Sequence, residues 1–103
     1  MENWLRCKIR RGQFSGEYVV QGDTVDGQGF SLFAEPSDVR IDACREVGQD
    51  ETTGGWIRVE VVDRQDGIVL VRLPSEALER GYFVSVRASD VKPQSEARRL
   101  EPA

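Results

Sequence analysis

The chain repeats itself at an offset of 52 residues, and this internal repeat limits the folds open to it more than any other feature. Residues 4–39 align with residues 56–91 without a gap, and eight of the 36 positions are identical. Residue frequencies predict about two identities by chance at one offset. The sequence therefore predicts a duplicated unit, although two similar strand–turn–strand segments that share common turn residues would be the alternative. The identical positions of the first unit are Trp4, Arg6, Gln13, Val19, Gly29, Ser37, Asp38 and Val39.

Each unit has the pattern of three strands. In residues 4–10 and 56–62 apolar side chains alternate with polar ones, as in a strand with one solvated face, and Val62 is the exception. The other predicted strands are residues 17–21, 30–34, 68–73 and 82–87. The Asp66-Gly67 dipeptide predicts a hairpin turn, and residues 68–71 are apolar on both faces, which predicts a central strand buried on both sides.

The segments outside these strands are predicted from their local composition. Ser75, Glu76 and Glu79 favour a single helical turn over residues 75–80, which Gly81 would end. Residues 45–55 are polar and glycine-rich and predict an exposed linker between the units. Residues 94–103 predict a flexible or short helical tail after a single domain over residues 1–93.

These elements predict an all-β fold. Three strands in about 40 residues cannot bury their apolar faces alone, whereas two copies can do so by pairing around a pseudo-two-fold axis. We expect a small six-stranded antiparallel barrel or sandwich built from two pseudo-symmetric three-strand repeats. At the level of fold class this pattern resembles small SH3-like barrels, and no family is recognised from its motifs.

Composition narrows the functions that such a barrel could have. The chain has no histidine, which removes the commonest general base and metal ligand, and Cys7 and Cys44 match no metal-binding spacing. We therefore expect no catalytic residue, metal or cofactor, and a buried reduced thiol at Cys7. A net charge of −4 disfavours nucleic acid as a general partner. No apolar stretch suits a membrane span or a signal peptide, so the expected location is the cytoplasm.

The duplicated tryptophans are the first candidate contact residues. Trp4 shares a strand face with Arg6, Lys8 and Arg10, and Trp56 shares one with Arg58. An aromatic beside a basic stripe can stack on a base or on a partner's side chain. The residue pattern favours the alternative, in which each tryptophan closes one end of the barrel and the cations lie on a solvated face with cross-strand ion pairs.

Three phenylalanines form the second candidate set. Phe33 and Phe83 lie on the strand phase opposite to their apolar neighbours, and Phe14 lies in a turn, so all three are predicted to be exposed. Exposed aromatics on one side of the molecule would indicate an interface, and burial against the linker or the tail is the alternative. The repeated Asp38 and Asp90 fit turns at strand ends better than acid–base chemistry.

Together these observations predict a non-catalytic binding module, not an enzyme. Its expected partner is another protein or a second copy of the chain, without a membrane. One alternative is contact with RNA or single-stranded DNA through Trp4, Arg6, Lys8 and Arg10. A second alternative is a carboxylate enzyme that would need Asp38 and Asp90 in one pocket.

Overall fold

The computed structural model describes residues 2–12, 16–41, 52–79, 81–93 and 101–102. Nearly all of them lie in strands, which confirms the all-β class. The strands are β1 (Glu2–Arg11), β2 (Tyr18–Asp23), β3 (Gly29–Ala34), β4 (Val39–Ile41), β5 (Thr52–Gln65), β6 (Ile68–Ala77), β7 (Gly81–Arg87), β8 (Val91–Pro93) and β9 (Glu101–Pro102). Two short 3-10 helices, η1 (Pro36–Asp38) and η2 (Ala88–Asp90), precede β4 and β8.

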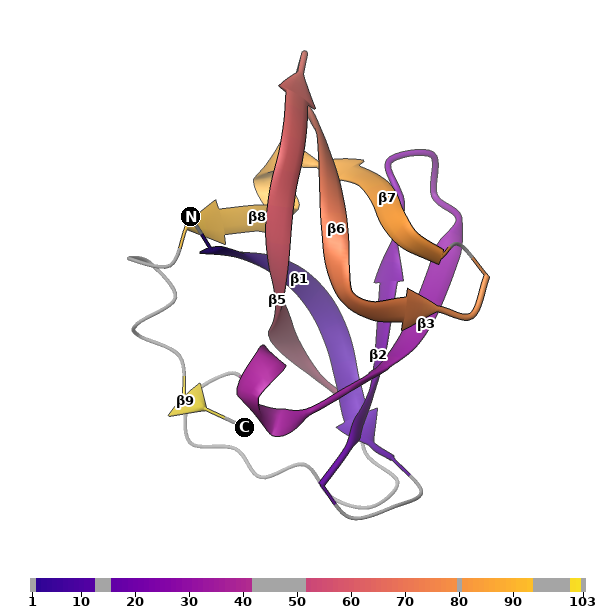
Figure 1. Cartoon of the computed structure of the whole chain (residues 1–103), viewed down its shortest axis with the longest axis vertical. Coiled ribbons are helices and arrows are strands. Elements are labelled where there is room, and N and C mark those ends of the chain that lie inside the picture. Colours follow the sequence, from indigo (N-terminus) through magenta and orange to yellow (C-terminus); the bar gives the residue numbers. More distant parts are fainter. Residues whose placement is uncertain (1, 13–15, 42–51, 80, 94–100, 103) are drawn as a thin grey trace.

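Six antiparallel strands in the order β3-β2-β1-β5-β6-β7 curl into a half-barrel (Figure 1). The long pairing of β1 with β5 forms the centre. The open side is narrowed by two backbone hydrogen bonds, from the Leu78 amide to the Ser31 carbonyl and from the Val25 amide to the Ser85 carbonyl. Each bond joins the loop of one hairpin to the last strand of the other, so the two hairpins hold each other in place.

The strand register has the symmetry that the repeat predicts. Leu5 lies opposite Ile57 at the middle of the β1–β5 pairing, so that Trp4 lies opposite Arg58 and Arg6 lies opposite Trp56. The short strands are exchanged between the halves, because β4 pairs with β5 while β8 pairs with β1. Residues 2–41 (the first half) and residues 52–93 (the second half) therefore follow the same order of elements. An origin by duplication stays a prediction.

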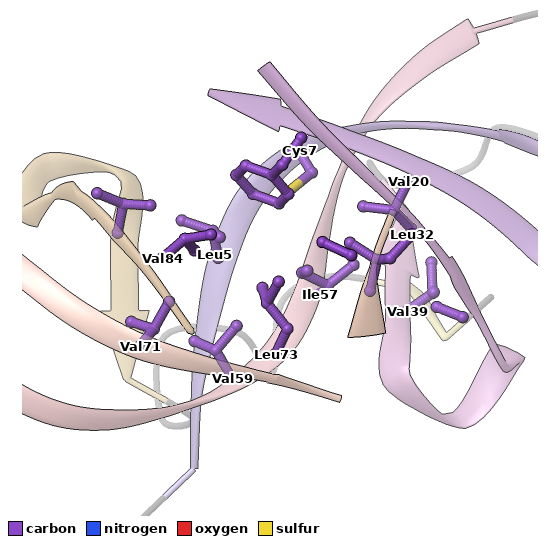
Figure 2. Packing of buried hydrophobic residues seen from close by; sticks show 14 of the residues in the cluster. Leu5, Cys7, Val20, Leu32, Val39, Ile57, Val59, Val71, Leu73 and Val84 are labelled. Atoms are coloured by element: carbon purple, nitrogen blue, oxygen red, sulfur yellow. The ribbon is translucent and has the colours of Figure 1, made fainter. Parts of the chain in front are cut away.

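The core lies on the concave side of the sheet. Side chains from β1, β2, β3, β4, β5, β6 and β7 converge there, as the labelled residues of Figure 2 show. The alternation predicted for the first strand is confirmed, since Leu5, Cys7 and Ile9 are buried while Arg6, Lys8 and Arg10 are exposed. The fully buried core side chains include Ile9, Val20, Val39, Ile57, Val71 and Val86.

Val62 breaks the predicted alternation because it lies in a β-bulge. The register between β5 and β6 shifts between Val61 and Asp63, which places the exposed Val62 outside the regular pairing. The hairpin of the second half is also one residue shorter, since nine residues separate the paired Val61 and Val71 whereas ten separate the paired Ile9 and Val20. As a result Val20, rather than Val19, is the counterpart of Val71, and both are completely buried.

The turn at Asp66-Gly67 is confirmed. Both residues have positive φ, 51° and 81°, which is the conformation that two-residue hairpins favour. Gly67 takes this conformation without the steric cost that a side chain would add. The β5–β6 hairpin continues to this turn and projects at the top of Figure 1.

Three local predictions are wrong. Residues 75–77 continue β6 instead of forming a helical turn, because the Ser75 hydroxyl donates to the Phe33 carbonyl and tertiary pairing outweighs local propensity. Residues 52–55 belong to β5 rather than to a linker, and Gly55 allows the Arg40 carbonyl to approach a position where a Cβ would lie 2.7 Å away. The predicted tail contributes β9, which pairs with β4. The remaining linker and tail residues lie outside the described ranges.

The expectation that residues 68–71 are buried on both faces is also wrong. Val69 and Val71 face the core, but Ile68 is 41 % exposed and Leu70 is half-buried. A strand with apolar side chains on both faces normally has both faces covered. In the described part of the chain, only the face of this strand that carries Val69 and Val71 is covered.

Candidate functional site

The two tryptophans form equivalent clusters with cations on the convex side of the sheet. Trp4 is completely buried, and the guanidinium carbons of Arg40 and Arg58 lie 4.7 and 5.8 Å from the centre of its ring. Around the half-buried Trp56, the Lys92 ammonium lies at 3.9 Å and the guanidinium carbon of Arg6 lies at 5.2 Å. Cations at these distances are attracted by the ring electrons. Each cluster thus combines one half's tryptophan with an arginine of the other half.

These clusters limit the role predicted for the tryptophans. The ring of Trp4 is not at the surface, and that of Trp56 is occupied by two cations of the chain itself. Arg58 is held further by its Nη2, which donates to the Ser37 carbonyl at 2.8 Å, and by Asp38 Oδ1, 3.7 Å from its Nε. The rings and cations therefore serve mainly as a second, convex-side packing layer.

The sequence interpretation missed Arg40 and Lys92. Each follows the repeated Ser-Asp-Val segment by one residue, at the same offset of 52 as the tryptophans. This conserved spacing within the chain was the available signal. The sequence prediction did not include Arg40 and Lys92, because the alignment of the two units ends at residues 39 and 91.

The basic stripe of β1 is exposed as predicted. Arg6, Lys8 and Arg10 all face solvent, and the residues opposite Lys8 and Arg10 on β5 are the uncharged Gly54 and Thr52. On the other side of β1, Lys8 lies opposite Gln21. The stripe therefore carries positive charge without neighbouring acids on β5.

Two grooves open where the central strands change partners. On one edge β1 pairs with β8 up to Leu5 and with β2 from Lys8 onward, and a groove of about 890 Å³ opens between these partners. On the equivalent edge of β5, a groove of about 410 Å³ opens between β4 and β6. All eight residues of the smaller groove have counterparts in the larger one. The pairs are Asp38 and Asp90, Arg58 and Arg6, Val59 and Cys7, Glu60 and Lys8, Arg72 and Gln21, Leu73 and Gly22, Pro74 and Asp23, and Tyr82 and Phe30.

The grooves differ in how their floors are filled. Phe30 is buried in the larger groove, and a Cβ added to Gly22 would lie 2.5 Å from its ring. In the smaller groove Leu73 is buried instead, and Tyr82 is 42 % exposed with the Arg72 guanidinium carbon 5.8 Å from its ring centre. The larger groove has a polar rim, whereas the smaller one has an aromatic wall.

The groups that could carry chemistry are not brought together. Asp90 lines the larger groove and Asp38 the smaller one, so the two carboxylates do not share a pocket. Cys7 is a free thiol, as predicted, and burial raises its pKa, with the Asp90 carboxylate adding to the effect. No group of metal-ligating side chains occurs among the described residues. Phe14 and Cys44 lie outside them.

The exposed aromatics belong to different faces. Phe33 is 46 % exposed on β3 and Phe83 is 53 % exposed on β7, as their strand phase predicts. Phe83 lies on the convex face of the second half, where the register aligns three rows of residues across β5, β6 and β7. We call this surface the β5–β7 face. Its rows are Glu60, Arg72 and Phe83, then Asp63, Leu70 and Ser85, then Gln65, Ile68 and Arg87.

The β5–β7 face combines apolar and charged side chains. Leu70 and Ser85 are half-buried, and the other seven residues of the face are exposed. Of the six large apolar side chains found exposed in the described ranges, only Phe33 belongs to the first half; the others are Val62, Ile68, Leu78, Tyr82 and Phe83. Exposed apolar surface is therefore concentrated in the second half.

Comparisons with known proteins add no functional information. The chain matches no protein-family model, no curated protein and no solved structure. In the part of the chain that the structure describes, no helix is long and apolar enough to cross a membrane.

Proposed function

We propose that this protein is a non-catalytic binding module that engages a protein partner through the β5–β7 face. The observation that carries the proposal is β6, a strand with apolar side chains on both faces of which only one is covered. Ile68 and Phe83 are exposed on either side of the half-buried Leu70. Apolar patches of this kind on small domains commonly mark interaction sites.

The composition of the face also supports a protein partner. Protein interfaces are enriched in aromatic residues and arginine, and Phe83 lies directly opposite Arg72, while Ile68 lies opposite Arg87. The carboxylates Asp38 and Asp90, which an enzymatic alternative would require together, line separate grooves. Burial keeps the Cys7 thiol protonated, which makes it a poor nucleophile.

A photo-crosslinking amino acid at position 83 tests this proposal in cells. We expect ultraviolet light to produce a covalent protein adduct when p-benzoylphenylalanine replaces Phe83. The same replacement of Phe33 is the matched control, because that ring is similarly exposed on the first half. Equal adduct formation at both positions, or none at position 83, would contradict the proposal.

Nucleic acid remains a second candidate because of the exposed stripe of Arg6, Lys8 and Arg10. The residues opposite Lys8 and Arg10 on β5 are uncharged, so these two cations are available for phosphates. Against it, neither tryptophan ring is open for a base to stack on. Fluorescence anisotropy with a labelled 12-nucleotide single strand would favour this candidate if binding weakened with salt and in Arg10→Glu.

A further inference from the structure

We infer that the convex face of the first half binds single-stranded nucleic acid, with its phosphates along β1 and a base stacked on Phe33. This inference develops the second candidate function and does not depend on the β5–β7 face. The surface, which we call the β1–β3 face, consists of two rows that the register aligns across β1, β2 and β3. The rows are Lys8, Gln21 and Ser31, then Arg10, Val19 and Phe33.

The two cations of the β1–β3 face are placed to hold successive phosphates. Lys8 and Arg10 are exposed, and neither has an ion pair with another described residue. Because they are two residues apart on β1, their side chains leave the same face of the sheet about 7 Å apart. Successive phosphates of an extended single strand are separated by a similar distance. Each cation can therefore take one phosphate.

The exposed ring of the same face lies where a base would reach it. Phe33 is 46 % exposed and shares a row with Arg10, two strands away, which corresponds to about 10 Å. A base extends from its phosphate over a similar distance, so a phosphate bound to Arg10 directs its base across Val19 onto Phe33. This ring supplies the stacking surface that the two tryptophans do not. Because the flat faces of paired bases are covered within a duplex, the ring selects a single strand.

The acids near the β1–β3 face lie on the side of the bases, away from the two cations. Asp23 ends β2, and Glu17 and Glu35 lie just outside β2 and β3. The Glu79 carboxylate lies beside β3, where it accepts hydrogen bonds from the Ser31 amide and hydroxyl at 3.1 and 3.0 Å. Carboxylates repel phosphates, so β1 is the path that the backbone of the strand would follow.

The second half lacks this combination of charge and ring. At the offset of 52 residues, the position of Lys8 is taken by Glu60 and that of Arg10 by Val62. An acid at the first position would repel a phosphate, and Val62 lies in the β-bulge outside the regular pairing. Binding of nucleic acid is therefore assigned to the first half alone.

The electrostatic part of the inference is tested by fluorescence anisotropy with a labelled 12-nucleotide oligothymidylate over a series of salt concentrations. We expect binding that weakens with salt. The double variant Lys8→Gln/Arg10→Gln should bind at least tenfold more weakly, and the slope of log affinity against log salt should fall by about 1.4, because two phosphate contacts are lost. Arg72→Gln/Arg87→Gln is the matched control, since it changes the net charge equally on the second half, and it should leave affinity and slope unchanged.

The stacking part is tested with Phe33→Ala. This variant should bind oligothymidylate at least about fivefold more weakly with an unchanged salt slope, whereas an abasic strand of the same length should bind it as well as the unmodified chain. Phe83→Ala, which removes a similarly exposed ring from the second half, should have no effect.

Several results would overturn the inference. They are no binding at about 50 mM salt and about 100 μM protein, equal losses in the two charge variants, or an unchanged affinity in Phe33→Ala. Equally tight binding of polyglutamate with the same number of charges would also overturn it and would indicate an acidic protein as the ligand of this face. None of these results alters the crosslinking expected at position 83, so the proposed function would stand or fall separately.

Discussion

The two grooves are built on the same framework, yet one aromatic side chain is buried and its counterpart is exposed. Phe30 lies against Gly22 in the first half, whereas Leu73 occupies the corresponding floor in the second half and Tyr82 lies outside. The size of the floor residue and the burial of the neighbouring ring therefore differ together between the two halves. Two halves with one backbone plan can thus present different surfaces.

The convex faces of the two halves also carry different side chains. The first half presents cations and neutral polar residues around Phe33, and the second presents Ile68, Leu70 and Phe83 between acids and cations. The core residues at equivalent positions, such as Val20 and Val71, are equally buried. Symmetry is retained where the halves hold each other together and is lost where they meet solvent.

The largest expected difference between the halves concerns the tryptophans. Trp4→Ala should reduce the free energy of unfolding by about 4 kcal/mol, because it removes a completely buried ring. Trp56→Ala should cost about half as much, since this ring is only half-buried. Urea denaturation followed by circular dichroism measures both. Equal losses of free energy of unfolding would show that the two tryptophan clusters contribute equally to stability, contrary to this prediction.

Exchange of the groove floor should have the next largest effect. Gly22→Leu should destabilise the chain by about 2 kcal/mol, because the new side chain overlaps the ring of Phe30. Adding Phe30→Tyr should recover part of this loss, since the ring can then lie outside with its hydroxyl in water, as Tyr82 does. The same denaturation assay applies. If the free-energy losses of the two single substitutions simply added in the double variant, the explanation for the different burial of Phe30 and Tyr82 would be wrong.

The smallest expected effect is the pH dependence due to Cys7. The pKa of this thiol is raised in the folded chain, so above about pH 8.5 the unfolded chain loses a proton that the folded chain retains. Stability should therefore fall by about 1 kcal/mol between pH 8 and pH 9.5 through this group. Cys7→Val, which copies Val59 of the second half, should remove that part of the decline. If the stability of Cys7→Val declined with pH as much as that of the unmodified chain, the thiol would be excluded as the cause of the decline.

The sequence was sufficient for the elements that depend on local pattern. Period-two alternation located β1 and β5, and Asp66-Gly67 located the turn between β5 and β6. It was insufficient where distant contacts decide, as at Ser75, whose hydroxyl bonds to the Phe33 carbonyl 42 residues away. The exchange of β4 and β8 between the halves depends on such contacts as well.

The candidate site was only partly predictable for a related reason. The phase of Phe83 in its strand indicated exposure, and the structure bears this out. Residues 68–71 are apolar throughout, and no local pattern tells whether the second face of such a strand is covered within the chain or by a partner. The stacking of Arg40 and Lys92 on the tryptophans required the register of four strands.

The central claim is that the two halves share a framework while only the second half presents a protein-interaction face. Paramagnetic broadening of backbone and side-chain NMR signals by an uncharged soluble nitroxide measures the exposure of both faces in one sample. On addition of the protein captured through position 83, broadening at Ile68, Leu70 and Phe83 should decrease, while that at Val19 and Phe33 should stay constant. A parallel decrease on both faces, or no change on either, would contradict the account.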